Sequence, residues 1–394
     1  MSKETIDLNK DAEAIEQDLL NIRHDLHRFP EPSMHEHKTA ERIRDELDLL
    51  NLKWQEVGGT GTLAFLDGAH PGPTILLRAD IDALPLKEKS RYKYPSENEG
   101  YMHACGHDVH ATALLGAAKL LTKYKEHLHG SVHFVFQQAE ELGHGSQYFI
   151  SENVTNGAKA IYGFHVTPDA PLGSAVLTDG TDAASCDYML VKLYGKKSHI
   201  AKPHLGFDTT VAASDIVLRL RDLKASFNPI DNILIGIGRV SSGNTWNIVA
   251  DYAEIEGTVR ALSKDAHDRA VLATKELIDK IAALHNVRAE YKFETNTPCL
   301  VNHPEAYKVM KVSASEVLGS EDKIINRTYP LGFGGDDFAA FSEQIPGCFI
   351  HLGTALDGKE DTSVPLHSDN IYITDDVIIL GTKLLTRCAL AHLL

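Results

Sequence analysis

The sequence HACGHDVHATALLGAAKLL, residues 103–121, joins a group of polar side chains to a long apolar run. Residues 109–121 have the pattern of a helix, and Asp108 is its expected N-cap. Cys105 and His107 come just before this helix, whose positive N-terminal end favours a thiolate over a thiol. Thiolate and imidazole are good ligands for a divalent metal ion. A free cysteine beside surface histidines is the alternative interpretation.

Strand-like and helical patterns alternate around this segment. Buried strands are expected over residues 74–78, 131–136 and 158–163, and helices over residues 12–29 and 39–50. This alternation predicts an α/β fold, in which a mostly parallel sheet carries helices on both faces.

The pattern changes near residue 185. Residues 188–293 read as strand, helix, strand, strand, helix and strand, which suits a compact α+β unit with an antiparallel sheet. After about residue 298 the chain is expected to return to the first domain. We therefore predict a larger domain in two parts, residues 1–184 and 299–394, interrupted by an inserted smaller α+β domain, residues 185–298.

Several potential ligands follow predicted strands. Asp80, Asp82, Glu140, Glu141 and His165 each come just past the expected end of a strand. In open α/β sheets, ligands bind along the edge formed by the carboxyl ends of the strands. Five such groups are enough for two metal ions that share a bridging ligand.

The adjacent carboxylates Glu140 and Glu141 need a special backbone. Neighbouring side chains on a regular strand point to opposite faces, so the chain must turn if both are to reach one site. Gly143 and Gly145 permit such a turn. One carboxylate can then bind metal while the other moves protons. A solvated strand end is the alternative.

Other polar groups are less specific by themselves. The alternative interpretation of His165 is a histidine of the core. The alternative interpretation of His367, in LHSDN, is a residue at the start of the C-terminal helix. The glycine-rich segment 331–338 lacks the lysine of a phosphate-binding loop and carries two aspartates, so a tight turn lining a pocket is expected. In the insert, Arg260 suits a carboxylate, with a solvated strand face as the alternative.

Composition excludes several classes of protein. The 394 residues are too many for one average domain, and 39 Lys and Arg against 55 Asp and Glu give a net charge of −16. This charge repels a phosphate backbone, so no nucleic-acid partner is expected. Five scattered cysteines are not a disulfide framework, and no apolar run reaches 18 residues. The polar N-terminus resembles no signal peptide, so we predict a cytoplasmic protein with no membrane partner.

Five motifs follow one another along the chain, in the order HACGHDVHATALLGAAKLL, FQQAEE, GFHV, GGDDFAAFSEQIPG and LHSDN. Taken together, they resemble the motifs of a family of two-metal metallopeptidases and amidohydrolases. The family includes aminoacylases, carboxypeptidases and succinyl-diaminopimelate desuccinylase. The likeness is greatest to its hippurate hydrolases and auxin–amino-acid conjugate hydrolases, and it covers the chain from about His24 to the C-terminus.

The resemblance implies a catalytic domain that holds two divalent ions, with the insert as a lid that often dimerises. Manganese or zinc is expected, and cobalt and nickel are compatible. The implied metal ligands are Cys105 as the bridge, His107, Glu141, His165 and His367. The resemblance also implies that Glu140 is the general base and later the general acid, and that Asp80 orients a ligand. It implies that His199 binds the oxyanion across a dimer. Asn247, Arg260 and the backbone of Gly335 are implied to bind the substrate carboxylate.

The expected activity is hydrolysis of the amide bond of an N-acyl amino acid or a small peptide, within a homodimer formed through the lid. A dipeptidase or carboxypeptidase of the same fold is an alternative. A cysteine hydrolase with Cys105 as nucleophile and a catalytically silent metal- or amino-acid-binding protein are others. The sequence departs from the family pattern at Lys197 and Ile200 around the lid histidine, at Asp336, and in lacking a proline after Asn247.

Overall fold

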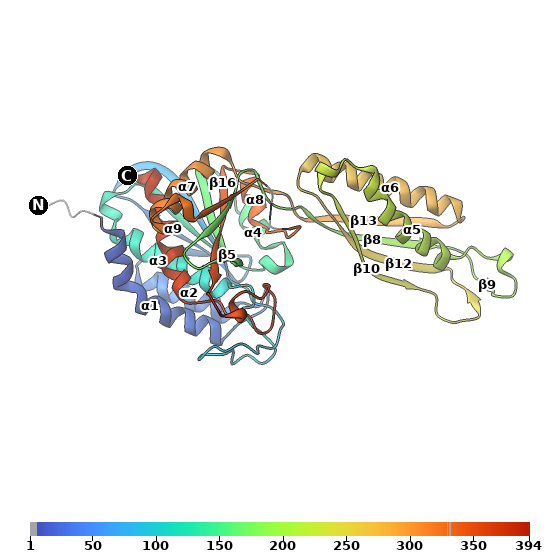
Figure 1. Cartoon of the computed structure of the whole chain (residues 1–394), viewed down its shortest axis with the longest axis horizontal. Helices are drawn as coiled ribbons and strands as arrows, with labels where there is room; N and C mark the ends of the chain where they lie inside the picture. Colours follow the sequence, from blue (N-terminus) through green and yellow to red (C-terminus); the bar gives the residue numbers. More distant parts are fainter. Residues whose placement is uncertain (1–5, 329, 331) are drawn as a thin grey trace, which may run out of the picture. The chain divides into compact units, whose positions relative to one another are not determined.

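The computed structural model describes residues 6–328, 330 and 332–394, which form two compact units (Figure 1). The first unit comprises the described parts of residues 1–182, 301–329 and 337–394, and the second those of residues 183–300 and 330–336. Residues 1–5 of the predicted first domain and Leu331 of the glycine-rich segment lie outside the described residues.

An eight-stranded sheet forms the centre of the first unit. Its strands, in spatial order, are β1 (Lys53–Val57), β2 (Gly61–Asp67), β4 (His129–Gln137), β3 (His70–Asp80), β5 (Ala158–Pro171), β16 (Gly347–Ala355), β6 (Ala175–Thr178) and β15 (Ile324–Arg327). The central strands β4, β3, β5 and β16 are parallel to their neighbours in that group. The predicted α/β class with a mostly parallel sheet is therefore confirmed.

Helices cover both faces of this sheet. They are α1 (Leu8–Arg28), α2 (His37–Leu49), α3 (His107–Lys123), α4 (Gly145–Ser151), α7 (Pro304–Leu318), α8 (Phe338–Ser342) and α9 (Asp376–Leu393). Two consecutive residues of β5 show the two layers. A Cβ on Gly163 would meet the ring of Phe338 in α8, whereas the ring of Phe164 packs on Gly381 in α9. Successive strand residues face opposite sides, so α8 and α9 lie on opposite faces.

Two local predictions are wrong. Asp108 is not the N-cap of α3, because the helix begins at His107 after Gly106. Its carboxylate instead bonds to Arg23 and His27 of α1. The expected strand ends are also wrong. Asp80 is the last residue of β3, since pairing with β4 extends that strand, and His165 lies inside β5, because pairing with β16 extends it to Pro171. Both errors arise from partners that are distant in the sequence.

The second unit is an antiparallel sheet covered by two helices. Its strands, in spatial order, are β10 (Leu234–Ser242), β12 (Tyr252–Arg260), β8 (Cys186–Tyr194) and β13 (Arg288–Thr297), with helices α5 (Thr209–Leu223) and α6 (Lys264–Leu284). Alternate residues of β8 are buried, and they form one apolar core with both helices. Separately, β9 (Ser198–His199) pairs with β11 (Ile248–Val249), and β7 (Thr181–Ala183) with β14 (Leu300–Val301).

Across residues 6–328, 330 and 332–394, no helix has both the length and the apolar character needed to cross a membrane.

Candidate metal centre

Cys105 lies between two imidazole rings from distant parts of the chain. Its Sγ is 3.3 Å from Nε2 of His165 and 3.3 Å from Nε2 of His367. The ligand atoms of Cys105, His107 and His165 lie within 4.8 Å of one another, and so do those of Cys105, Glu141 and His367. Cys105 thus belongs to two potential ligand groups, as a thiolate shared by two ions would.

Local backbone conformations bring these residues together. Gly106 has a φ of 90°, which lets the chain turn from Cys105 directly into α3. His367 has a φ of 64°, and its N–H donates to the carbonyl of Ala104 at 3.0 Å. This bond ties the segment before α9 to the segment before α3.

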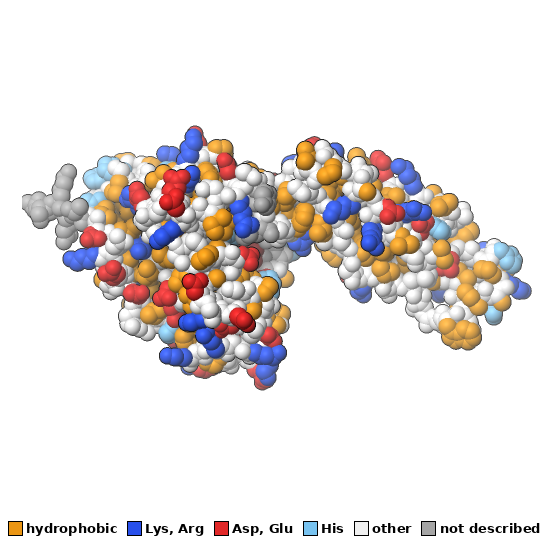
Figure 2. Space-filling view, in the orientation of Figure 1, with side chains coloured by type: hydrophobic (Ala, Val, Ile, Leu, Met, Phe, Trp, Pro, Cys, Tyr) orange, Lys and Arg blue, Asp and Glu red, His pale blue; other side chains and the backbone are white. Residues whose placement is uncertain are grey.

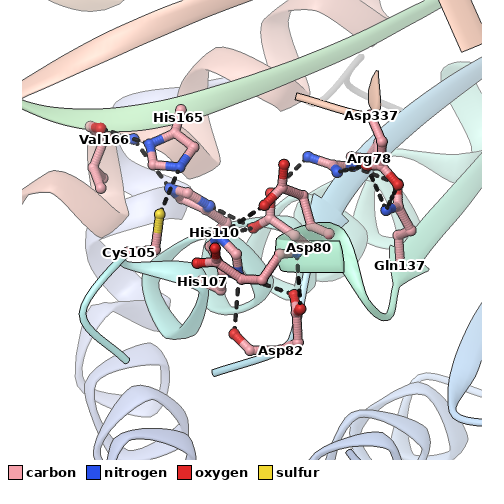
Figure 3. A network of polar contacts seen from close by, with 12 residues as sticks. Arg78, Asp80, Asp82, Cys105, His107, His110, Gln137, His165, Val166 and Asp337 are labelled. Atoms are coloured by element: carbon pink, nitrogen blue, oxygen red, sulfur yellow. Dashed lines mark hydrogen bonds and ion pairs between the residues drawn. The ribbon is translucent and has the colours of Figure 1, made fainter. Parts of the chain in front are cut away.

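Hydrogen bonds define the unprotonated nitrogen of two of the histidines. His107 donates through Nδ1 to the carbonyl of Asp82 at 2.9 Å, and His165 donates through Nδ1 to the carbonyl of Val166 at 2.6 Å (Figure 3). In the neutral ring, each Nε2 is therefore left with a lone pair. Burial lowers the pKa of His107, but Asp80 and Cys105 outweigh it and hold this pKa well above its ordinary value, so the neutral ring of His107 is favoured only beside a bound cation. Burial lowers the pKa of His165 well below its ordinary value, which keeps the ring neutral. Nε2 of His107 is buried with no hydrogen-bond partner among the described residues, as expected for a metal ligand.

His110 lies in the same cluster but has a different role. The N–H of Val166 donates to Nε2 of His110 at 3.0 Å, and Nδ1 of His110 donates to Oδ1 of Asp80 at 2.6 Å. Both ring nitrogens are used, so His110 orients its neighbours and is not available as a ligand. The sequence analysis gave His110 no role, although its position three residues after His107 on a helix places both on one face.

Asp80 is held in a buried network of charged groups. Oδ2 of Asp80 accepts from Nη1 of Arg78 at 2.6 Å, and Arg78 also reaches Oδ1 of Asp337 at 2.9 Å (Figure 3). Gln137 donates to the same Asp337 carboxylate. Burial alone would raise the pKa of Asp80, but His107, His110 and Arg78 hold it well below its ordinary value. A permanently ionised Asp80 fixes His110 through Nδ1 and lies 3.7 Å from Nε2 of His107.

The rest of this network was not predicted from the sequence. Arg78 is a charged residue inside the apolar run that precedes Asp80, and it is fully buried in the structure. A buried arginine requires acidic partners, so its position in β3 was a usable signal. Its partner Asp337 is 259 residues away in the sequence, and no local pattern links the two.

The chain turns at the Glu140–Glu141 pair, and the turn begins one residue before the pair. Ala139 already has a φ of 53°, and a short 3-10 turn then covers Glu140–Leu142. Gly143 has a φ of 68° and ends this turn. Gly145 allows a close approach, since a Cβ there would lie 1.6 Å from the carbonyl oxygen of Gln138. Oε2 of Glu140 lies 4.0 Å from Nε2 of His107.

The remaining predicted site residues form two separate pairs in the second unit. His199 of β9 lies beside β11, and the carbonyl of Asn247 accepts from the N–H of Ile200 at 3.0 Å. Arg260, in contrast, donates through Nη1 to the carbonyl of Phe333 at 2.6 Å, in the glycine-rich segment that contains Gly335. A Cβ on Gly335 would lie 2.6 Å from Oγ1 of Thr297.

Strand β12 separates these two pairs. It runs from Tyr252, just after the Asn247 segment, to Arg260. At about 3.3 Å for each residue, this strand spans about 26 Å. Within the second unit, the structure therefore does not bring Asn247 and Arg260 together.

The donor set fits divalent transition metals. The set consists of one thiolate, three imidazoles and one carboxylate. Thiolate and imidazole suit zinc, cobalt and nickel, and the carboxylate also suits manganese. Burial raises the pKa of the Cys105 thiol well above its ordinary value. The thiolate is thus favoured at neutral pH only beside a cation.

Comparison with known proteins gives consistent results. Residues 76–391 match the peptidase family M20/M25/M40. The chain is 34% identical to an N-acetylcysteine deacetylase of Bacillus subtilis, over 88% of this chain and 90% of that protein. It is 34% identical to an IAA-amino acid hydrolase of Arabidopsis thaliana, over 95% of this chain and 85% of the relative. A thermostable carboxypeptidase of Saccharolobus solfataricus is 33% identical, over 98% of this chain and 96% of that protein.

A solved structure extends the similarity to the fold. The crystal structure of a dinuclear metal-binding peptidase from Bacillus subtilis superimposes with a TM-score of 0.82 and 32% identity, over 96% of this chain and 98% of that one.

Proposed function

We propose that this chain, which belongs to the peptidase family M20/M25/M40, hydrolyses the amide bond of N-acyl amino acids or small peptides. It is a metal-dependent amidohydrolase, as its family and its relatives establish. The observation that carries the proposal is the position of Cys105 Sγ, 3.3 Å from each of two imidazole Nε2 atoms. The named substrates of the relatives, acylated or peptide-linked amino acids, support the substrate class.

The proposed centre holds two divalent ions, with manganese or zinc expected. Cys105 would bridge them, and the other ligands would be His107, Glu141, His165 and His367. When bound, the ions would supply a Lewis acid for the substrate carbonyl and acidify a water molecule to give the nucleophile.

Glu140 is the proposed proton carrier. It follows the left-handed Ala139 and precedes the proposed ligand Glu141, so its carboxylate lies next to the ligands without being required as one. Its side chain is only 11% exposed. In this position Glu140 would accept a proton from the attacking water and later deliver it to the leaving amine.

Arg260 and the backbone of Gly335 would bind the carboxylate of the substrate. Arg260 is fixed by its bond to the carbonyl of Phe333, which places a guanidinium beside the glycine-rich backbone. Guanidinium groups bind carboxylates through paired hydrogen bonds. A local cation of this kind compensates for the negative net charge of the chain.

His199 would stabilise the oxyanion. The N–H of Ala201 donates to Nδ1 of His199 at 3.0 Å, so the neutral ring carries its proton on Nε2 and can donate there. Because β12 separates His199 and Asn247 from Arg260, we propose that the first two act at the site of a second copy of the chain.

Exposed apolar side chains support a dimer through this part of the second unit. Figure 2 shows hydrophobic side chains gathered around the β9 end of the unit. The residues concerned are Ile200, Leu205, Phe207, Trp246 and Ile248, and Trp246 is 88% exposed. Exposed large apolar side chains that gather in one region support a protein–protein contact there.

The test is release of free amine from a panel of N-acyl amino acids and dipeptides. The protein is stripped of metal and resupplied with manganese or zinc. Metal-dependent release from acyl amino acids supports the proposal, and release from dipeptides alone favours the peptidase alternative. Saturable binding without product, in protein loaded with two ions, would contradict hydrolysis. Activity that resists chelation and is lost on thiol alkylation would favour Cys105 as nucleophile.

A further inference from the structure

Ala139 has an unusual backbone for a residue with a Cβ. Its φ of 53° and ψ of 40° place it in the left-handed region, and its side chain is fully buried. This conformation is unfavourable for residues other than glycine. Because Ala139 directly precedes Glu140, its conformation determines the direction in which the Glu140 side chain leaves the backbone. Neighbouring groups must therefore hold it in place.

Glu36 makes the contact that holds this residue. Its Oε1 accepts from the N–H of Ala139 at 2.9 Å, and its Oε2 accepts from Oγ1 of Thr60 at 2.6 Å. Glu36 is 0% exposed and lies immediately before α2, 103 residues from Ala139 in the sequence. Both carboxylate oxygens are thus engaged in a buried setting, where hydrogen bonds are stronger than in water.

A second buried carboxylate holds the other side of the turn. Oδ2 of Asp82 accepts from the N–H of Glu141 at 3.1 Å, so the backbone is held both before and after Glu140. Asp82 also accepts from Nδ1 of His107, so its substitution would disturb a proposed metal ligand. Glu36 hydrogen-bonds to Thr60 and Ala139, neither of which is a proposed ligand. Glu36 therefore allows a selective test.

We propose that Glu36 is a positioning residue, which fixes Ala139 in the left-handed conformation and so directs Glu140 towards the reacting atoms. The proposal rests on the proposed role of Glu140 as proton carrier. Loss of the Glu36 carboxylate lets the turn relax, which displaces the Glu140 carboxylate while the ligands on other segments stay in place. Misplacement of a catalytic group by about 1 Å can cost about a hundredfold in rate.

The test compares Glu36→Ala with Glu36→Gln in the full metal-loaded protein. Glu36→Ala should lower kcat by about ten- to a hundredfold, with KM and the metal content unchanged. Glu36→Gln should retain most of the activity, because the amide oxygen still accepts from Ala139 and the amide nitrogen can donate to Thr60. In the Glu36→Ala background, Ala139→Gly should restore part of kcat, since glycine adopts the left-handed region without strain.

Glu46→Ala is the matched control. Glu46 is another buried carboxylate of α2, 4% exposed, and it bonds to Arg42 and Lys119 away from the turn. Its loss should lower Tm without lowering kcat. A folded, metal-loaded Glu36→Ala protein with the kcat of the wild type would overturn the proposal. If Glu36→Ala does not fold, Glu36→Met replaces it, because methionine has a similar length but no carboxylate to accept from the N–H of Ala139. An unchanged kcat in that folded variant has the same meaning.

The activity of Glu140→Gln shows whether the role of Glu36 or the role of Glu140 is wrong. If Glu140→Gln is inactive while Glu36→Ala has normal kcat, Glu140 keeps its role and Glu36 loses the one proposed here. If Glu140→Gln keeps normal activity, the proposed role of Glu140 is wrong whatever Glu36 does.

Discussion

Individual ring nitrogens divide the histidines of the centre into two kinds. His107 and His165 donate through Nδ1 to backbone carbonyls, which directs Nε2 towards the ligand cluster. His110 instead uses both nitrogens, one with the N–H of Val166 and one with Asp80. The hydrogen-bond partners thus leave Nε2 available for a metal ion in His107 and His165 but not in His110.

Substitution of Glu140 tests the proton carrier. Glu140→Gln preserves the size of the side chain but removes its basicity, so we expect both metal ions to remain while kcat falls by about 10²–10⁴-fold. Steady-state kinetics and metal analysis on the same preparation measure both quantities. Near-normal kcat would exclude Glu140 as the general base.

Cys105 is expected to control metal content. Cys105→Ala removes the ligand shared by the two groups, so the number of bound ions per chain should fall. Cys388→Ala is the matched control, because Cys388 is also a buried free thiol but packs against Met310 in the core. Equal metal content in the two variants, measured by elemental analysis, would make Cys105 a structural residue.

The first turn of α3 is tied to two other helices through buried charges. Asp108 accepts from Nε of Arg23 at 3.1 Å and from Nδ1 of His27 at 2.7 Å. Arg23 also donates to Asp375, immediately before α9, at 2.5 Å. The start of the helix that follows Cys105 and His107 is therefore fixed by α1 and α9 together.

Loss of Arg23 should be costly. Arg23→Met leaves two carboxylates without their buried cation, so we expect a loss of about 3–5 kcal/mol in the free energy of unfolding. Arg28→Met, on the same helix, removes an exposed partner of Glu97 and should cost less than about 1 kcal/mol. Urea unfolding of both variants provides the comparison, and similar losses would refute the structural importance of the buried network.

The same network predicts a pH dependence of stability. Burial lowers the pKa of His27, but Asp108 and Glu88 outweigh it and raise the pKa above 6.5, although Arg23 opposes them. Stability from a raised pKa is fully present below the unfolded value and is lost as the pH rises through the folded value. The stability difference between wild type and His27→Gln should therefore be larger at about pH 6 than at about pH 9. A difference that is larger at the higher pH would contradict this assignment.

Local sequence patterns predicted the elements but not all of their contacts. Apolar periodicity and short apolar runs identified α1, α3 and the central strands, because burial on one face or on both imposes these patterns. The role of Asp108, the length of β5 and the Arg78–Asp337 pair depend on residues far apart in the sequence. The motifs brought Cys105 and its neighbours to attention, whereas Glu36 became apparent only from the fold.

The length of β12 has a consequence for the assembly. His199 lies beside one end of β12 and Arg260 lies at the other end, so we propose that a site using both takes them from two copies of the chain. We expect inactive His199→Ala and inactive Glu140→Gln to recover part of the activity when mixed. A hybrid dimer would contain one site in which both His199 and Glu140 are intact. Activity of mixtures with demonstrated subunit exchange measures this. No recovery would favour action within one chain.

A two-metal centre bridged by Cys105 can be observed by anomalous diffraction from a crystal loaded with zinc or manganese. We expect two anomalous peaks, both within bonding distance of Sγ of Cys105, at about 2.3 Å for zinc. One ion should also bind His107 or His165, and the other Glu141 or His367. A single peak, or peaks that do not contact Cys105, would contradict it.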